Sequence, residues 1–444
     1  MKALQYLCLF IITICITLFN TVYAQQKLES IANIYNSKLK EENKGIAVLV
    51  KKNNAVETIS LGNFNLDNNH VFNIGSATKT FTAILILQEE EKGTIQLTDS
   101  IGKYLSAIKN VNSSLTIESL LKHQSGLGEI VGRDTKTYFY STNDSIYNQN
   151  FLEKFPENNP DMVGHYSYCN SNYILLGRIL EKITDRSYFD LVRERIFIPL
   201  HMANSYPYVS KTIKNLAIPY DDNKNVFELL DFRFFADYAY AAGSIASTLS
   251  DMEKFYTSLF ETELLLKKES VHKMLPAKGE SYGLGLMSFT HDNSTYYGHG
   301  GNNIGYAFRN LYDPKTKNVI LFFNNTHSIP FEASLKEDLL DYVNNKQVLT
   351  KLNINISESF KDFVGKYVLE KVNAELEIII ENDQMFMLIQ DQKVLLAYQD
   401  QNTLYDVKVG VRLKRNTDDN NTLTFTQGGF TDKLNKKMIE TSKK

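Results

Sequence analysis

A serine and a lysine three residues apart open an apolar stretch of the chain, and this pair could carry nucleophilic chemistry. Ser76 follows the run 72–75, and Lys79 shares one face with it if the stretch is helical. A serine hydroxyl is a weak nucleophile until a base takes its proton, and a lysine amine can do so when burial lowers its pKa. The N–H groups at the start of such a helix can face a developing oxyanion.

The spacing alone is not specific, because other serine and lysine pairs share it and are typical of solvated helix faces. These pairs are Ser37 and Lys40, Ser106 and Lys109, Ser119 and Lys122, and Ser270 and Lys273. Only Ser76 follows a strand-like apolar run and a glycine and begins a buried helix, which we expect to end near Gly93. Context therefore favours Ser76 as the nucleophile.

A second candidate is a polar loop that runs into an apolar helix predicted over 174–182. Tyr168 and Asn170 can point into one cleft, the phenol as proton carrier and the amide as a hydrogen-bonding clamp. Taken alone, the pair is as well explained by capping of the helix. Cys169 between them is a rival nucleophile, but no charged residue adjoins it in sequence, which favours a small buried filler.

A third candidate is a glycine-rich patch between strand-forming residues, containing His299, Gly300, Gly301 and Asn302. Glycines inside a strand indicate close approach of a ligand or of another backbone. Without the other motifs, a lone histidine here is more often structural.

The elements that must position these residues follow from hydrophobic periodicity and turn signals. A helix is predicted over 28–39, followed by a hairpin of two strands over 45–50 and 57–61. A long helical region over 93–270 follows and includes a helix over 250–260. Further strands are predicted over 282–289, 305–312 and 318–323, and a closing helix over 331–344. Sheet at both ends with helices between predicts an α+β fold, an antiparallel sheet flanked by helices with a large helical insertion.

Beyond residue 346 the pattern changes to short alternating strands, predicted over 375–380, 385–389, 405–413 and 422–426. We therefore expect a domain over 25–345, a linker over 346–358 and a C-terminal all-β, barrel-like domain over 359–436.

The N-terminus predicts export. Lys2 precedes an apolar stretch over 7–19, and Val22 and Ala24 frame a small-residue exit, so residues 1–24 are predicted to be a signal peptide. An uncleaved anchor is the alternative, but the stretch is shorter than the roughly 20 residues that a spanning helix needs. Cleavage leaves no stable membrane span and makes Cys169 the lone cysteine, which excludes an internal disulfide. The protein would be periplasmic or secreted.

Composition narrows the function classes. With 48 Lys plus Arg against 51 Asp plus Glu, the net charge is −3, and no basic block is present, so nucleic acid is excluded as a partner. The 8 histidines show no metal-ligand spacing, and we expect neither metal nor cofactor. No G-x-S-x-G elbow occurs, which disfavours an α/β-hydrolase.

In the order Ser76-x-x-Lys79, Tyr168-x-Asn170 and His299-x-Gly301, the motifs resemble the serine β-lactamase and penicillin-binding protein superfamily, in particular its class C-like branch. The stretches 93–99, 120–127 and 242–251 support the resemblance, which covers residues 28–345. The tail from Phe360 resembles the lipocalin-like β-barrel appended to many members.

The resemblance implies a role for each motif residue. Ser76 would be the nucleophile, Lys79 and Tyr168 a coupled proton-handling pair whose base is left open, and Asn170 the ligand of the substrate amide. His299, Gly300 and Gly301 would form the strand edge along which substrate lies, with an oxyanion hole from the backbone N–H groups of Ser76 and Asn302.

Two departures from the class C pattern concern the third motif, where His299 replaces lysine and Gly300 replaces a hydroxyl residue. A histidine with its ordinary pKa of about 6.5 is mostly neutral at pH 7 and grips a carboxylate poorly. Activity on carboxylate substrates would then rise as the pH falls through that pKa.

Together these features predict an exported serine hydrolase that forms an acyl-enzyme on Ser76, resembling a D-amino-acid peptidase or D-alanyl-D-alanine carboxypeptidase. Its substrate would be a small molecule or peptide of cell-wall origin. The alternatives are an esterase acting on uncharged acyl substrates and a penicillin-binding sensor that acylates without turnover. The sequence leaves the oligomeric state open.

Overall fold

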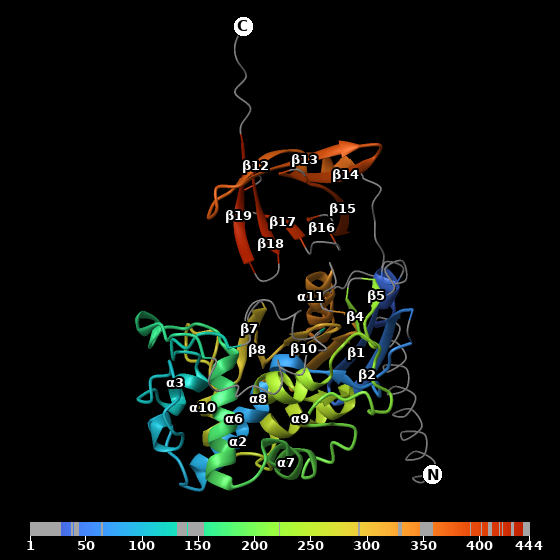
Figure 1. The fold of residues 1–444 in the computed structure, drawn as a ribbon. Coiled ribbons are helices and arrows are strands. Elements are labelled where there is room, and N and C mark those ends of the chain that lie inside the picture. Colours follow the sequence, from blue (N-terminus) through green and yellow to red (C-terminus); the bar gives the residue numbers. More distant parts are fainter. Residues whose placement is uncertain are drawn as a thin grey trace, which may run out of the picture. The chain divides into compact units, whose positions relative to one another are not determined.

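The chain forms two compact units, one within residues 38–328 and one made of the residues before and after that range (Figure 1). The computed structural model describes residues 28–36, 39, 44–63, 65–130, 140, 155–221, 223–291, 294–326, 331–346, 358–390, 392–400, 402–406, 411–416, 418–419, 421–427 and 430–437. The predicted signal peptide lies outside these residues. No described helix combines the length and the apolar character that crossing a membrane requires.

An antiparallel sheet runs through the first unit, in the strand order β2-β1-β11-β10-β8-β7, with β9 paired to β10. Its strands are β1 (Gly45–Lys52), β2 (Ala55–Gly62), β7 (Met287–His291), β8 (Ser294–Gly298), β9 (Gly301–Asn303), β10 (Tyr306–Tyr312) and β11 (Val319–Asn324). Asn53 and Asn54 turn the first hairpin with φ of 51° and 64°, in the left-handed region that asparagine tolerates. The predicted hairpin is confirmed.

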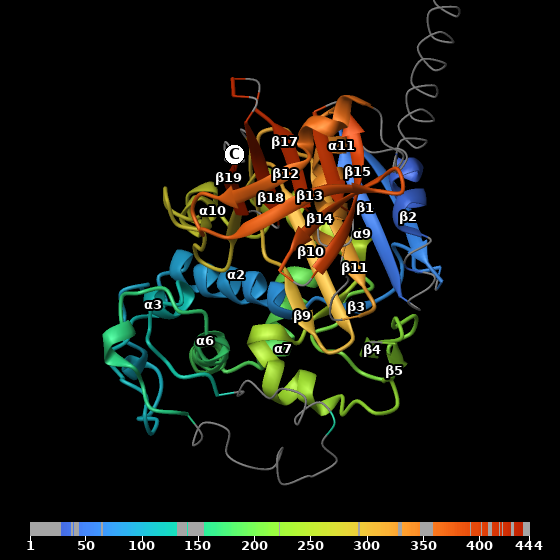
Figure 2. The same ribbon diagram turned by 90° about the horizontal axis from the view of Figure 1, so that it is seen from above.

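Helices of the insertion surround α2, the helix that carries Lys79, which contacts α6, α7 and α8 (Figure 2). The helices are α2 (Thr78–Glu91), α3 (Ile117–Leu121), α6 (Asn170–Thr184), α7 (Tyr188–Val192), α8 (Tyr240–Gly243), α9 (Leu249–Glu261) and α10 (Lys268–Met274). The helix α9 packs on β1 and β11. The predicted helices at 174–182 and 250–260 are confirmed, as is the α+β class.

Stacked aromatic rings fix the segment that leads to Ser76. Phe72 lies in the short strand β3 (Phe72–Asn73), and its ring stacks on Phe323 of β11 with centroids 4.4 Å apart. The ring of Phe323 in turn stacks on that of Phe308 of β10, with centroids 4.5 Å apart. The β3 segment pairs with β6 (Ala246–Ser247). The residues before Ser76 are therefore held against the main sheet.

The predicted strand over 282–289 is wrong in its first half, since β7 begins only at Met287. Gly285 has a φ of +72°, and a Cβ atom on Gly283 would lie 2.1 Å from the carbonyl oxygen of Met274. The segment is thus pressed against α10 and turns, which breaks the extended pattern. As a consequence, Tyr282 is not part of β7 but forms an isolated bridge with Met287, and its hydroxyl contacts His299.

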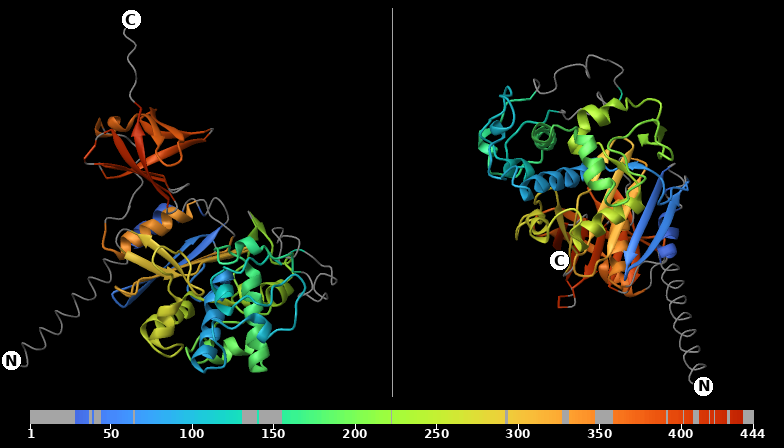
Figure 3. Two further views of the ribbon diagram at one scale, coloured as in Figure 1. Left: turned by 90° about the vertical axis from the view of Figure 1, so that its left-hand side faces the viewer. Right: turned by 90° about the horizontal axis from the view of Figure 1, so that it is seen from below.

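The second unit contains a closed antiparallel barrel in which neighbouring strands pair in chain order and β12 pairs with β19 (Figure 3). Its strands are β12 (Gly365–Leu369), β13 (Glu375–Glu381), β14 (Gln384–Ile389), β15 (Gln392–Asp400), β16 (Thr403–Asp406), β17 (Val411–Arg415), β18 (Thr422–Gln427) and β19 (Phe430–Lys436). Side chains such as Ile378, Leu413 and Leu434 are fully buried in its core. The predicted all-β domain is confirmed.

One strand prediction fails in the barrel, because the segment 405–413 is not one strand. β16 ends at Asp406, β17 begins at Val411, and the two pair antiparallel. An alternating pattern on both sides of a turn resembles one longer strand, which explains the error. The predicted linker at 346–358 and the domain boundary at 345 stay predictions.

Two helices complete the second unit, one over 28–36 and α11 (Glu332–Val343). Arg412 of β17 forms ion pairs with Asp338 at 2.7 Å and with Asp341 at 2.9 Å. The hydroxyls of Tyr35 and Tyr405 both donate to Asp338, the second at 2.8 Å. Burial raises the pKa of Asp338 to about 6, against the opposing influence of Arg412. This buried network joins both helices to the barrel strands.

Candidate active site

Ser76 and Lys79 lie at the start of α2, where a 3₁₀ turn (Gly75–Ala77) leads into the helix. The Lys79 Nζ lies 3.0 Å from the Ser76 Oγ, and it donates to the Asn170 Oδ1 at 2.7 Å and to the Ala242 carbonyl at 2.8 Å. Lys79 is completely buried, and this burial lowers its pKa to about 7, with Glu129 and Cys169 acting in the opposite direction. The amine can therefore exchange a proton with Ser76 near neutral pH.

Packing explains why a lysine is tolerated here. Every side chain of α2 from Thr78 to Leu87 is buried, and the Phe81 ring stacks on that of Phe255 with centroids 3.9 Å apart. Desolvation in such a core penalises the charged ammonium. The Asn170 and Ala242 oxygens offset part of this penalty because they accept hydrogen bonds from it. The sequence predicted this proximity, and the structure brings the pair together.

Tyr168 lies over Lys79, whose Nζ is 4.9 Å from the centroid of the phenol ring. The Tyr168 hydroxyl interacts with Ser76, while burial of the group raises its pKa above the usual value of 10. The residue as a whole remains 40% exposed. Tyr168 thus presents a protonated phenol next to the nucleophile, a suitable donor for a leaving group.

Glu129 is a site residue that sequence reasoning missed. Its Oε2 accepts a hydrogen bond from the Asn170 backbone N–H at 2.8 Å and from the Asn170 Nδ2 at 3.1 Å. Because the amide nitrogen faces Glu129, the amide oxygen faces Lys79. Glu129 follows the supporting stretch 120–127 by two positions, but nothing in its sequence surroundings pointed to this contact.

We expect Glu129→Gln to shift the acid limb of the kcat/KM profile to lower pH. The carboxylate raises the pKa of Lys79, so its neutral replacement lowers that pKa further below about 7. Glutamine can still accept from Asn170, and kcat/KM at pH 8 should stay within about tenfold. The measurement is the pH profile, with Glu118→Gln as the control, since Glu118 forms an ion pair with the half-buried Lys122. If the acid limb of the profile does not shift, the Glu129 carboxylate does not influence the pKa of Lys79 and this prediction is wrong.

His299 is buried, with 2% of its surface exposed, and its Nε2 lies 3.0 Å from the Tyr282 hydroxyl. Burial lowers its pKa to about 3, and the charge of Lys79 adds to the effect. The expectation that this ring titrates with its ordinary pKa of about 6.5 is therefore wrong. Activity that depends on pH near 6 to 7 cannot originate from His299.

A directional hydrogen-bond chain holds the third motif. The backbone N–H of Cys169 donates to the His123 Nδ1 at 3.1 Å, which leaves the His123 Nε2–H to donate to Tyr282 at 3.2 Å. The Tyr282 hydroxyl then donates to the His299 Nε2, and the His299 Nδ1–H donates to the Gly300 carbonyl at 2.7 Å. Sequence analysis did not single out His123 or Tyr282 for this role.

Two glycines allow the backbones of β9 and of the nucleophile turn to touch. Gly75 has a φ of +52°, and a Cβ atom on it would lie 2.7 Å from the Asn302 nitrogen. A Cβ atom on Gly301 would lie 2.5 Å from the Ser76 nitrogen. The backbone N–H groups of Ser76 and Asn302 are thus neighbours, as the predicted oxyanion hole requires. The catalytic roles of these groups stay predictions.

Cys169 is a buried thiol with 3% exposure, and burial raises its pKa to about 11. A thiol of this kind is a poor nucleophile at neutral pH, which agrees with its interpretation as a filler.

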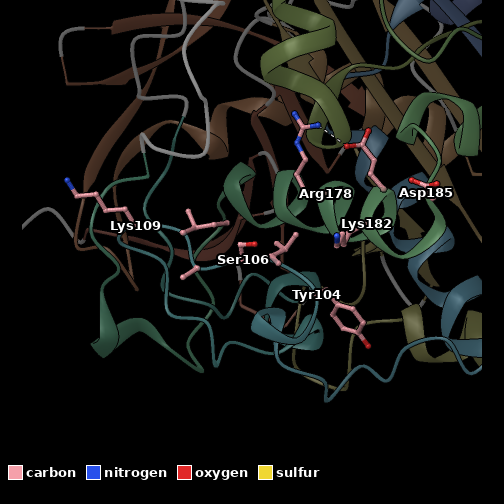
Figure 4. Close-up of a pocket in the computed structure, with 10 residues that line it drawn as sticks. Tyr104, Ser106, Lys109, Arg178, Lys182 and Asp185 are labelled. Carbon is pink, nitrogen blue, oxygen red and sulfur yellow. Dashed lines mark hydrogen bonds and ion pairs between the residues drawn. The ribbon is translucent and has the colours of Figure 1, made fainter.

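A separate open cavity of about 630 Å³ lies at the other end of α6 (Figure 4). Its lining includes Tyr104, Lys109, Arg178, Lys182 and Asp185 but no residue of the three motifs. Among the described residues, no cluster of histidine, cysteine and carboxylate side chains is arranged to hold a metal ion.

Comparisons with known proteins found one matching family model and several similar proteins. The Beta-lactamase family model matches residues 34–344. Penicillin-binding protein 4* of Bacillus subtilis is 24% identical over 77% of this chain and 81% of its own length. The teichoic acid D-alanine hydrolase of Staphylococcus aureus is 28% identical over 45% of this chain and 48% of its own length. The D-amino acid amidase of Ochrobactrum anthropi matches in structure with a TM-score of 0.60 and 22% identity, covering 72% of this chain and 97% of its own.

Proposed function

This chain belongs to the β-lactamase family and is a serine hydrolase, and on that premise we propose that it is an exported enzyme that cleaves D-amino-acid peptides through an acyl-enzyme on Ser76. The observation that carries the proposal is the buried Lys79 amine, 3.0 Å from the Ser76 Oγ, with a pKa of about 7. A neutral amine at this distance can remove the proton of Ser76 as the hydroxyl attacks. Export rests on the N-terminal segment 1–24.

Acylation forms a bond between the Ser76 Oγ and the substrate carbonyl carbon and breaks the bond from that carbon to the leaving nitrogen or oxygen. The proton of Ser76 passes to the pair of Lys79 and Tyr168, and the same pair returns a proton to the leaving group. The neighbouring N–H groups of Ser76 and Asn302 would stabilise the oxyanion. Water then attacks the acyl-enzyme and releases the acid. We treat Lys79 and Tyr168 as one titrating unit.

The names of two relatives support a D-amino-acyl substrate. One is a D-amino acid amidase and the other a teichoic acid D-alanine hydrolase, so an amide and an ester of a D-residue are the bonds concerned. A third relative is named as a penicillin-binding protein. For this chain we propose an amide or ester of a D-amino acid of cell-wall origin. An esterase acting on uncharged acyl groups is the second candidate, favoured by the neutral, buried His299.

We expect a fluorophosphonate or penicillin probe to add one adduct to Ser76. With penicillin, the mass of the adduct should appear and then clear within minutes to hours, because the acyl-enzyme is hydrolysed. The measurement is intact mass over time, followed by peptide mapping of the labelled residue. A penicillin adduct that persists indefinitely, together with no turnover of D-alanyl peptides or esters, would favour the non-turnover sensor instead.

A further inference from the structure

The side chain of Asn73, three positions before Ser76, lies where three segments of the candidate site meet. Asn73 is the second residue of β3, and only 1% of its surface is exposed. Its amide has N–H donors at one end and a carbonyl acceptor at the other. Each end forms hydrogen bonds to segments that carry groups of the proposed mechanism.

The acceptor end of the amide binds the turn that carries Ser76 and the strand β9. The Asn73 Oδ1 accepts from the Gly75 backbone N–H at 3.1 Å and from the Asn303 Nδ2. Gly75 directly precedes Ser76, whose N–H group is one half of the predicted oxyanion hole. Asn303 directly follows Asn302, whose N–H group is the other half. One buried oxygen therefore links the two halves.

The donor end of the amide binds the end of α8 and the turn that follows it. The Asn73 Nδ2 donates to two backbone carbonyls, that of Gly243 at 3.0 Å and that of Ile245 at 2.9 Å. The carbonyl just before this segment, that of Ala242, accepts from the Lys79 ammonium at 2.8 Å. The same amide thus fixes the segment that supplies an acceptor to the proton-handling lysine.

An amide of this length satisfies both ends, and an acid or an apolar side chain of similar size does not. The carbonyl oxygens of residues 243–245 lie within 3.3 Å of the Asn73 Nδ2 and can only accept, whereas the Gly75 N–H can only donate. An aspartate would place a carboxylate against these carbonyls. A leucine would remove the hydrogen bonds at both ends of a buried site.

We propose that Asn73 is a positioning residue that holds the oxyanion hole and the acceptor of Lys79 in place relative to Ser76. It acts through the segments to which it is bonded and not on the substrate. Donors that face a developing oxyanion must be placed accurately, and a displacement of about 1 Å can cost about a hundredfold in rate. This inference rests on the proposed function, since the oxyanion hole and the proton transfer belong to that mechanism.

The test measures transition-state and ground-state binding in Asn73→Leu. We expect kcat/KM for a D-alanyl ester to fall about 10-fold to 100-fold. The boronic acid analogue of D-alanine forms a tetrahedral adduct on Ser76 that needs the same N–H groups, so its Ki should rise by a similar factor. Binding of the product D-alanine, which forms no such adduct, should change less than about threefold.

A second variant, Asn303→Ala, tests the same link from a half-buried position on β9 and leaves the Asn73 side chain in place. It removes the hydrogen bonds from the Asn303 Nδ2 to the Asn73 Oδ1 and, at 3.3 Å, to the Gly243 carbonyl. We expect kcat/KM to fall about threefold to tenfold with little change in Tm. In the double variant, the two losses should be less than additive because they concern one link.

Asn325→Leu is the matched control for a buried asparagine. Asn325 is also 1% exposed, accepts from the Gly45 N–H at 2.8 Å and donates to the Ile218 carbonyl at 3.3 Å. Its replacement should lower Tm, as that of Asn73 does, but leave the kcat/KM and the boronic acid Ki of the folded protein unchanged.

Three outcomes would overturn the inference: an unchanged kcat/KM in folded Asn73→Leu, a loss of activity without a matching rise in the boronic acid Ki, or an equal loss in Asn325→Leu. If Asn73→Leu does not fold, an unchanged kcat/KM in Asn303→Ala overturns it. The wild type distinguishes these results from a failure of the proposed function. A wild type that is neither labelled on Ser76 nor active would refute that function and this inference with it.

Discussion

Replacing Ser76 by alanine should abolish covalent labelling and lower kcat/KM by about a thousandfold or more, because no other group in the site can form the acyl-enzyme. The neighbouring Cys169 thiol cannot take over, since burial raises its pKa to about 11. The loss of one hydroxyl contact with Lys79 costs about 1 kcal/mol, so the fold should persist. Intact-mass labelling and steady-state turnover are the measurements.

A matched control is available for this variant. Ser106 has the same spacing to Lys109 as Ser76 has to Lys79, but both residues line the open cavity at the far end of α6. Ser106→Ala should leave labelling and turnover unchanged. Substantial turnover in a well-folded Ser76→Ala protein would refute the mechanism.

Lys79→Met should reduce acylation to a similar extent, because nucleophile and base act as one unit whose effects do not add. In the wild type, kcat/KM should rise as the pH increases through about 7, where the Lys79 amine loses its proton. The methionine variant should lose this acid limb together with its activity. The measurements are the pH profile and the double variant with Ser76→Ala, which should be no slower than either single variant.

The same replacement should also stabilise the protein at neutral pH. The pKa of Lys79 is lowered from 10.5 to about 7, so between these values the unfolded state binds more protons and stability rises with pH. Methionine removes this cost of burying a charge. The gain in the free energy of unfolding over the wild type should be largest below pH 7 and should decrease toward pH 10. Urea titrations at several pH values test the sign. Lys109→Met, at an exposed position, serves as the control and should show no such dependence.

The parts of the fold that could be predicted from sequence are those fixed by local chemistry. The Asn53-Asn54 turn, the apolar run of α2 and the alternation in β13 and β14 each specify their own element. The error at 282–289 arose where a distant backbone, that of Met274, decides the conformation. No local pattern contains this information.

The residues of the candidate site likewise fall into those that the sequence could predict and those that it could not. The three motifs could be found because their spacing resembles a known family, and the structure places Ser76, Lys79 and Asn170 in contact. Glu129 escaped notice because its place in the site depends on which side chain it contacts across the fold. The low pKa of His299 follows from burial, which residue type alone does not reveal.

The buried network of the second unit has a consequence for the order in which the chain is assembled. Tyr35 is synthesised early, yet the hydroxyl of Tyr405, 2.6 Å away, stands 370 positions later in the chain. Until β16 and β17 emerge, Tyr35 lacks the hydroxyl of Tyr405, and Asp338 lacks the guanidinium of Arg412. Contacts so distant in sequence form late and slowly. Closure of this unit should therefore come late in folding, and the helix over 28–36 should be open to proteases before that step.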